Sequence, residues 1–284
     1  MNKQCSGVVM QQNFIIYNYI AAMDLQLKDK VVIVTGGAKG IGEGIVRTLV
    51  KEGAIPVIVG RNEQDNLKVV NDIIANGGQA FQVGAELTDP AAAAKAIERV
   101  MEKFGRIDGL VNNAGVNDGV GLETGNYERF VESLHKNVIH YYLMAHHALP
   151  ALKASKGSIV NIGSKVADTG QGGTSAYAAS NGARNALTRE WALELLPYEI
   201  RVNAVIVAEC YTPLYENWIK SIPNSEEKLA SIKAKIPFGQ RMTTAEEIAN
   251  ATVFLLSSAS SHTTGQLVYV DGGYVHLDRS ISPS

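Results

Sequence analysis

Short apolar runs rich in β-branched residues alternate along the chain with stretches in which apolar residues recur at helical spacing. Such continuous runs are typical of strands that are buried on both faces of a parallel sheet. The pattern predicts seven strands, at 31–34, 57–59, 80–83, 110–111, 158–162, 201–206 and 267–270. Pro56 stands directly before the second run, where a strand tolerates proline only at its start.

The segments between these strands have the periodicity of helices. Helices are expected over 41–50, 63–76, 90–104, 127–152, 176–196 and from 244 onwards. Pro90 suits the first turn of its helix, and Thr244 with Glu247 has capping-box spacing. Strict alternation of strand and helix predicts an α/β fold: a single Rossmann-type, doubly wound parallel sheet with helices on both faces.

The chain shows no internal repeat and no linker, and we therefore expect one catalytic domain over 24–278. An insertion at about 208–240 interrupts the alternation after the sixth strand, where a substrate lid would lie. Residues 1–23 are expected to be a disordered extension, with Met23 as a candidate start and a cleaved signal as the alternative. Residues 279–284 form a tail.

Composition and charge exclude several classes of protein. Of the 284 residues, 46% are hydrophobic and 19% are charged, which is globular composition. The net charge of −2 gives no reason to expect nucleic-acid binding. No apolar stretch reaches the roughly 18 residues that would span a bilayer. Two cysteines, Cys5 and Cys210, indicate a reducing compartment, and we expect the cytoplasm.

Glycines cluster over residues 35–42, between the first predicted strand and its helix. Glycine lets the backbone approach a pyrophosphate, and the helix N-terminus supplies unpaired N–H groups and positive potential. An ordinary tight turn is the alternative interpretation. The position after the first buried strand of a parallel sheet favours a dinucleotide site.

The sequence resembles the short-chain dehydrogenase/reductase family, and the similarity extends over residues 31–273. The residues that carry the resemblance are the T-G-x-x-x-G-x-G turn at 35–42, the Asn112-Asn113-Ala114-Gly115 segment, Asn137, the pair Ser164 and Tyr177 thirteen positions apart, Thr264-Gly265, and Val270-Asp271-Gly272-Gly273. The resemblance implies an NAD(P)-dependent oxidoreductase that acts on CH–OH groups. It also implies a homotetramer assembled partly through the helices at 127–152 and 176–196.

The resemblance also assigns roles to individual residues. Tyr177 would be the general base in oxidation, Ser164 would hold the substrate oxygen, and Asn137 and Asn181 would complete the catalytic set. The residues expected to contact the cofactor are Gly36, Lys39, Gly40, Ile41, Gly42, Arg61, Glu86, Leu87, Asn113, Ala114, Gly115, Tyr177 and Asn181.

Asn181 departs from the family pattern Y-x-x-x-K, in which a lysine stands at this position. A cation about 5 Å from the tyrosine, at an effective dielectric near 20, is worth ~3 kcal/mol or ~2 pKa units. Three interpretations follow. Lys165 or Arg184 supplies the charge, unless each is only a solvated surface cation. Alternatively, the oxidised nicotinamide acts with an acidic substrate hydroxyl, which we favour, or the chain is a catalytically weak cofactor-binding protein.

The residues after the second strand bear on cofactor choice. Gly60 stands where an acidic residue would bind the ribose 2′-OH of NAD. Arg61 and Lys39 could instead pair with a 2′-phosphate, which favours NADP over NAD. Both could also be solvated surface cations. Glu86 and Leu87 would lie at the adenine.

Gln171, Glu209 and Tyr211 are the main substrate candidates, because amides, carboxylates and hydroxyls suit a polyhydroxylated molecule. Segments at 169–171, 211–216, 236–242 and 273–274 resemble the L-fucose dehydrogenase branch of the family. The sequence therefore predicts oxidation of the anomeric carbon of L-fucose or a related aldose to the lactone. The alternative is a ketone or 3-oxoacyl reductase. The histidines have poor spacing for a metal, and no metal is expected.

Overall fold

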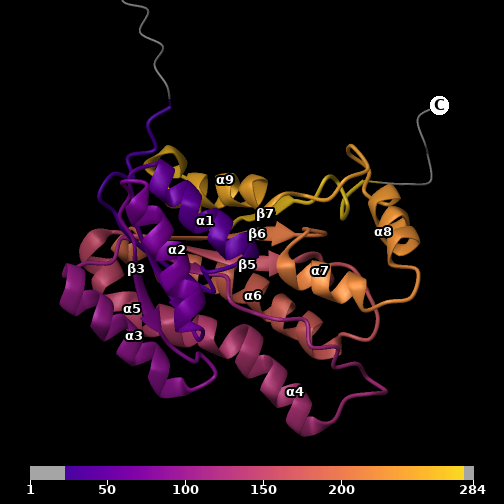
Figure 1. Ribbon diagram of the computed structural model, residues 1–284. Coiled ribbons are helices and arrows are strands. Elements are labelled where there is room, and N and C mark those ends of the chain that lie inside the picture. Colours follow the sequence, from indigo (N-terminus) through magenta and orange to yellow (C-terminus); the bar gives the residue numbers. More distant parts are fainter. Residues whose placement is uncertain (1–22, 278–284) are drawn as a thin grey trace, which may run out of the picture.

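Residues 23–277 are described by a computed structural model, in which every strand joins one seven-stranded parallel sheet (Figure 1). The order β3-β2-β1-β4-β5-β6-β7 reverses direction between β1 and β4, as in a doubly wound fold. The strands are β1 Val31–Thr35, β2 Ile55–Gly60, β3 Phe81–Gly84, β4 Gly109–Asn112, β5 Ser158–Ser164, β6 Arg201–Val207 and β7 Leu267–Val270. The predicted fold class is confirmed. The expected N-terminal extension and C-terminal tail fall outside the described residues, except Met23.

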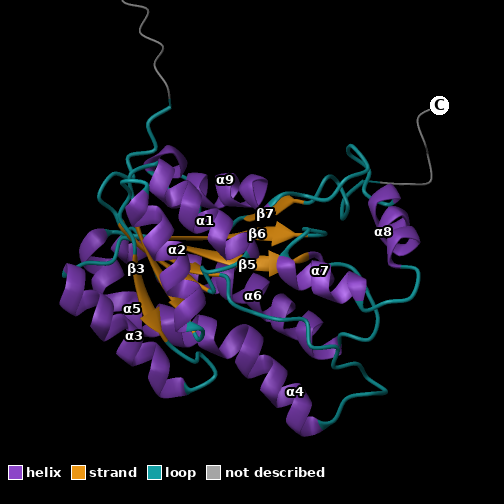
Figure 2. Cartoon of the chain, in the orientation of Figure 1, coloured by secondary structure: helices purple, strands orange, loops and turns teal. Residues whose placement is uncertain are grey.

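Helices cover both faces of the sheet (Figure 2). The α-helices are α1 Gly40–Lys51, α2 Glu63–Ala75, α3 Pro90–Phe104, α4 Tyr127–Leu134, α5 His140–Ser155, α6 Ser175–Glu194, α7 Pro213–Lys220, α8 Ser225–Ala234 and α9 Ala245–Leu256. Single turns of other helix types are η1 His135–Ile139, η2 Lys165–Ala167, η3 Leu196–Tyr198 and η4 Ser258–Ser260. Within residues 23–277, no helix is long and apolar enough to cross a membrane.

Successive residues of β1 point alternately into two separate hydrophobic cores. Val31 and Ile33 pack with α3, α5 and α6, whereas Val32 and Val34 pack with α1, α2 and α9. Side chains of a strand point alternately to opposite faces, so a strand covered on both sides must be apolar throughout. This is why β1 reads as an uninterrupted apolar run.

The sequence pattern places Pro56 directly before the second strand, but in the structure Pro56 is the second residue of β2. The N–H of Ile55 bonds to the carbonyl of Lys30 next to β1, so the nitrogen of Pro56 faces the opposite side. Pairing with β3 begins only at Val57, opposite Phe81. The missing N–H of proline therefore removes no bond from the sheet.

The predicted helical region at 127–152 is divided in two. A π-helical turn, η1, separates α4 from α5 and contains Asn137. The Asn137 side chain is fully buried and bonds to Ser133 in α4 and to Val116, which stabilises the irregularity. Turns of this type are rare and occur often at functional sites.

The insertion at 208–240 is more regular than its sequence suggests, because it contains α7 and α8. Figure 1 shows both helices beyond the arrowheads of β5, β6 and β7, at the carboxyl edge of the sheet. A parallel bridge between Cys210 and Thr243 closes the base of the insertion. The Thr243 N–H also donates to the Glu209 carbonyl at 3.0 Å. Whether the segment acts as a lid stays a prediction.

The buried carboxylate of Asp108 joins the amino ends of β1 and β4. It accepts from the Val31 N–H at 2.9 Å and from Arg106 Nε and Nη2 at 2.8 and 2.6 Å. Its own N–H donates to the Val31 carbonyl at 2.8 Å. Loss of this carboxylate would leave a buried donor without a partner, which costs about 1–3 kcal/mol.

We therefore expect Asp108→Ala to lower the free energy of unfolding by about 2 kcal/mol, measured by urea unfolding followed by circular dichroism. Asp72→Ala is the matched control, because it breaks an ion pair with Arg47 whose side chains are 48% and 43% exposed. Exposed pairs contribute about 1 kcal/mol or less. Equal unfolding midpoints for the two variants would contradict this account of Asp108.

Candidate active site and dinucleotide cleft

A cavity of about 870 Å³ opens at the carboxyl ends of β1, β2 and β4. This is the position at which the strand order reverses and where open α/β sheets bind their ligands. Eleven of the thirteen residues predicted to contact a cofactor line it: Gly36, Lys39, Gly40, Ile41, Gly42, Arg61, Glu86, Leu87, Asn113, Ala114 and Gly115. The structure thus gathers these residues in one cleft, while their contact with a cofactor stays a prediction.

The glycine turn at the base of this cleft needs its glycines for steric reasons. Gly36 and Gly40 have φ of +65° and +58°, a conformation that favours glycine. A Cβ on Gly42 would lie 2.2 Å from the Gly36 carbonyl oxygen. Lys39 at the N-cap of α1 makes no side-chain capping bond. The turn therefore fits a phosphate at the positive end of α1.

Thr35 ties this turn to the segment after β4. Its hydroxyl accepts from the N–H groups of Asn113 and Ala114 at 2.8 and 3.1 Å. The Asn113 amide donates to the Thr35 carbonyl at 2.9 Å and to the Gly36 carbonyl at 3.3 Å. Asn113 thereby fixes the floor of the cleft.

The two cations expected near the adenosine ribose both have acidic neighbours. Lys39 pairs with Asp65 at 2.6 Å, and Arg61 lies 3.8 Å from Glu86. The Arg61 side chain is 81% exposed. Arg61 is therefore a weakly held cation at the cleft rim, free to turn toward an anion.

Ser164 and Tyr177 come from adjacent elements at the same edge of the sheet. Ser164 is the last residue of β5, and Tyr177 lies in the first turn of α6. Both side chains are half-buried. The two side chains therefore lie at the carboxyl edge of the sheet, on the side of the dinucleotide cleft.

Asn137 is held by its side chain and offers its backbone carbonyl to Arg184. Its side chain accepts from the Val116 N–H at 2.8 Å and donates to the Ser133 carbonyl at 3.0 Å. Its carbonyl oxygen accepts from Nε of Arg184 at 2.7 Å. The π-helical turn presents this carbonyl toward α6.

Arg184 is not the solvated surface cation that the sequence left open. Its side chain is only 3% exposed, and Nη1 donates to the Asn181 amide oxygen at 3.1 Å. Asn181 is fully buried and donates in turn to the Tyr177 carbonyl at 2.9 Å. A direct contact between Asn181 and a cofactor stays a prediction, because its amide is engaged with these two residues.

Lys165 is not a surface cation either, because it forms a buried ion pair with Glu209. The two side chains are 8% and 15% exposed and come from the ends of β5 and β6. The Lys165 ammonium lies 3.9 Å from the centre of the Tyr274 ring. Burial and the nearby Glu209 carboxylate raise the pKa of the Tyr215 hydroxyl. We call these four residues the polar cluster.

Sequence reasoning missed Tyr215 and Tyr274 as members of this cluster, because aromatic residues carry no spacing signal of their own. The rings of Tyr211, Tyr215 and Trp218 form a series with centroids 6.0 and 5.0 Å apart. The predicted substrate residue Tyr211 is 45% exposed and belongs to this series. Gln171 is exposed in the loop before α6.

His140 also lines the cleft, and burial lowers its pKa to about 4. It is therefore neutral at physiological pH. Among residues 23–277 there is no group of three His, Cys, Asp or Glu residues placed to hold a metal ion.

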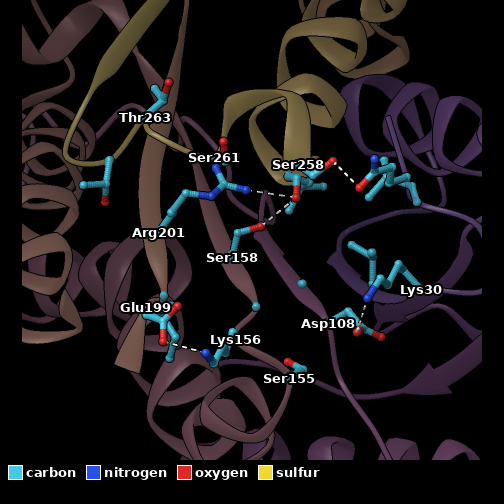
Figure 3. Close-up of a pocket in the computed structure, with 18 of the residues that line it drawn as sticks. Lys30, Asp108, Ser155, Lys156, Ser158, Glu199, Arg201, Ser258, Ser261 and Thr263 are labelled. Carbon is cyan, nitrogen blue, oxygen red and sulfur yellow. Dashed lines mark hydrogen bonds and ion pairs between the residues drawn. The ribbon is translucent and has the colours of Figure 1, made fainter. Parts of the chain in front are cut away.

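A second cavity, of about 720 Å³, lies at the opposite, amino edge of the sheet (Figure 3). Its charged groups pair with one another: Lys30 with Asp108 at 3.4 Å and Lys156 with Glu199 at 2.5 Å. Arg201 donates to carbonyls at the end of α9. The charged side chains of this cavity are therefore bound to other groups of the protein.

Sequence comparison finds relatives along most of the chain. Residues 36–275 match the family model described as enoyl-(acyl carrier protein) reductase. L-fucose dehydrogenase of Bos taurus is 35% identical over 253 residues, 89% of this chain and 92% of that protein. The 3-oxoacyl-[acyl-carrier-protein] reductase FabG of Thermotoga maritima is 34% identical over 253 residues, 88% of this chain and all of that protein.

Solved structures show the same fold. The crystal structure of Cj0485 dehydrogenase is 44% identical with a TM-score of 0.87, and the match covers 92% of this chain and 100% of that one. The ligand-free aldohexose dehydrogenase of Thermoplasma acidophilum is 31% identical with a TM-score of 0.81, covering 91% and 98%. Both neighbours are named as dehydrogenases.

The Gly42 geometry predicts that Gly42→Ala abolishes dinucleotide binding, because the methyl group would force the glycine turn apart. The change in NADPH fluorescence on titration measures binding. Gly182→Ala on α6 is the control, since a Cβ there meets no atom within 4 Å and alanine favours a helix by about 0.5–1 kcal/mol. Unchanged affinity in Gly42→Ala would show that the phosphate does not lie on this turn.

Proposed function

Because the chain belongs to the short-chain dehydrogenase/reductase family, we propose that it is an NAD(P)-dependent sugar dehydrogenase. It would oxidise the anomeric hydroxyl of L-fucose or a related aldose to the lactone. The names of two relatives, an L-fucose dehydrogenase and an aldohexose dehydrogenase, support a sugar substrate. The FabG relative supports reduction of a 3-oxoacyl group as the rival activity.

The polar cluster is the observation that favours the sugar. Lys165 directly follows Ser164, so its ion pair with Glu209 lies beside the expected reaction centre. A buried ion pair is costly compared with apolar packing of the same volume. A carboxylate accepts and an ammonium donates hydrogen bonds, so the pair suits the several hydroxyls of a sugar better than an acyl chain.

The aromatic series gives the same substrate class a second kind of contact. Tyr211 and Trp218 are 45% and 47% exposed, at the carboxyl edge of the sheet. A sugar ring has an apolar C–H face that packs on aromatic rings, while its hydroxyls need polar partners. The rings of the insertion and the ion pair between Lys165 and Glu209 at its base therefore match both surfaces of a sugar.

The residues present fit a nicotinamide dinucleotide, since the glycine turn lines the cleft and leaves the N-terminus of α1 without a side-chain cap. The bound cofactor supplies the hydride acceptor. In the proposed reaction, the hydroxyl proton would pass to the ionised Oη of Tyr177 as the anomeric C–H bond breaks, and the electron pair of that bond would leave as hydride for the bound dinucleotide. Ser164 Oγ donates a hydrogen bond to the same oxygen and orients it. The new C=O bond completes the lactone.

NADP is the cofactor we propose, with NAD as the alternative. Gly60 provides no carboxylate to bind a ribose 2′-OH, and the exposed Arg61 can reach a 2′-phosphate. A bidentate guanidinium–phosphate contact is stronger than the 3.8 Å approach to Glu86.

The proposal extends to assembly and compartment. Exposed apolar side chains on α4, α5 and α6 suit a homotetramer interface: Tyr127, Phe130, Tyr142 and Leu193. The compartment proposed is the cytoplasm, from the low cysteine count of the chain.

The proposed function predicts that the full chain reduces NADP, and less efficiently NAD, in the presence of L-fucose, D-arabinose or L-galactose. Absorbance of the reduced dinucleotide measures the rate. Tyr177→Phe should lower kcat by about 10²–10⁴-fold, since the proton acceptor is lost. Tyr198→Phe, whose ring is 41% exposed, is the control. Reduction of acetoacetyl-CoA without sugar oxidation would favour the 3-oxoacyl reductase, and dinucleotide binding without any turnover would favour a silent binding protein.

The polar cluster predicts a separate effect on the sugar. Glu209→Gln keeps the shape of the side chain but removes the charge, so KM for the sugar should rise about tenfold or more while KM for the dinucleotide stays the same. Glu216→Gln is the matched control, because Glu216 pairs with Lys220 on the surface of α7. An unchanged sugar KM in Glu209→Gln would remove the main support for a sugar substrate.

A further inference from the structure

We propose that Arg184 supplies the positive charge that a lysine supplies at position 181 in the family pattern, and that it thereby stabilises the ionised form of Tyr177. Arg184 acts through the field of its charge and through Asn181, so it is a positioning residue. The kinetic test of this inference rests on the proposed dehydrogenase function, but its spectroscopic test does not.

The guanidinium of Arg184 lies among the elements that carry the predicted catalytic residues. Arg184 lies on α6, two turns after Tyr177, so both side chains leave the helix on the same face. Nε donates to the Asn137 carbonyl at 2.7 Å, and Nη1 donates to the Ile162 carbonyl at 3.1 Å. The cation is thus held between α6, the π-helical turn and β5, the three elements that carry the predicted catalytic residues.

The hydrogen-bonding partners of Arg184 do not neutralise its charge. Two backbone carbonyls and the Asn181 amide oxygen accept from it, and the Tyr141 ring lies 4.2 Å from its central carbon. All four are uncharged. A cation held by neutral dipoles in a poorly solvated site projects its field further than one paired with a carboxylate.

Asn181 links Arg184 to Tyr177 through two hydrogen bonds. The amide oxygen of Asn181 accepts from Arg184, and its amide nitrogen donates to the Tyr177 carbonyl. A lysine at this position would have no need of this bridge. Asparagine is uncharged and short, and it leaves room for the guanidinium to approach from the next turn of the helix.

The last donor group of Arg184, Nη2, lies next to Gly115. Nη2 of Arg184 is buried and has no hydrogen-bond partner among the described residues. A Cβ on Gly115 would lie 2.8 Å from it, and Gly115 lines the dinucleotide cleft. The unpaired N–H group therefore lies against Gly115, at the floor of the cleft.

The other titratable groups around this region do not supply the charge. Burial and the charge of Arg184 lower the pKa of His140 to about 4, and burial raises the pKa of Tyr141 to about 12, so both are neutral at pH 7. Three further cations of the surrounding elements face carboxylates: Lys165 with Glu209, Lys136 with Glu132, and Arg61 with Glu86. Asp118 lines the cleft with the opposite sign and accepts from Ser133.

The kinetic experiment compares Arg184→Met with the double variant Asn181→Lys/Arg184→Met, which restores the family pattern. A general base works above its pKa, so loss of the cation should move the acidic limb of the kcat/KM profile upward by about one pH unit or more. The double variant should move the limb back. Arg189→Met, an exposed arginine on the same helix, is the control and should leave the profile in place.

The spectroscopic experiment needs no substrate. The absorbance of ionised tyrosine is titrated in the parent and in Tyr177→Phe, and the difference gives the ionisation of Tyr177 alone. The same pair of titrations is repeated in the Arg184→Met background, where the midpoint should be higher. If Arg184→Met does not fold, as judged by thermal unfolding, Arg184→Lys and Arg184→Gln replace it, and only the glutamine variant should shift the midpoint.

Two results would overturn the inference. One is a lower kcat in Arg184→Met at every pH with an unchanged profile and an unchanged tyrosine titration, which would mean a purely structural role. The other is a double variant that keeps the shifted profile. Absence of turnover in the parent contradicts the proposed function instead, and the titration then still decides the role of Arg184.

Discussion

A single hydroxyl, that of Thr35, holds together the part of the molecule on which the site depends. It accepts hydrogen bonds from two backbone N–H groups of the segment after β4. The side-chain amide of Asn113 in turn donates hydrogen bonds to the carbonyls of Thr35 and Gly36. β1 and β4 are neighbours in space but lie far apart in sequence. Because the strand order reverses at this pair, the two connections diverge and leave a cleft between them. The bonds of Thr35 and Asn113 keep that cleft open at a fixed width.

The π-helical turn solves a second packing problem. A continuous α-helix from α4 to α5 would satisfy the Asn137 carbonyl within the helix, and Arg184 would lose its closest acceptor. The extra residue of the turn directs this carbonyl toward α6 instead, at 2.7 Å from Nε of Arg184. The buried side chain of Asn137 compensates by bonding to Ser133 and Val116. An irregular backbone and a buried cation therefore stabilise each other.

Sequence alone predicted the features that depend on local chemistry. The strands were readable because β1 is apolar on both faces, and the glycine turn because its steric demands fall within eight residues. The burial of Lys165 and Arg184 could not be predicted, since it depends on acceptors from distant segments: Glu209 for one, the carbonyls of Asn137 and Ile162 for the other. The helix α7 was missed because it spans only eight residues, and α8 because it shows little apolar periodicity. The contacts expected between individual residues and a cofactor or sugar remain predictions.

The closed base of the insertion has a consequence for how such a protein can change. The bridge between Cys210 and Thr243 brings the two ends together before α7 and α8 begin to contribute. The contacts at the base of the loop therefore already offset the entropic cost of closing it. A longer loop raises that cost only slightly. Residues 211–242 can therefore change in length and sequence at little cost in loop-closure entropy. The aromatic part of the proposed substrate site can then diverge by replacement of one contiguous stretch of the gene, while Lys165, Glu209 and the cores on either face of the sheet stay in place.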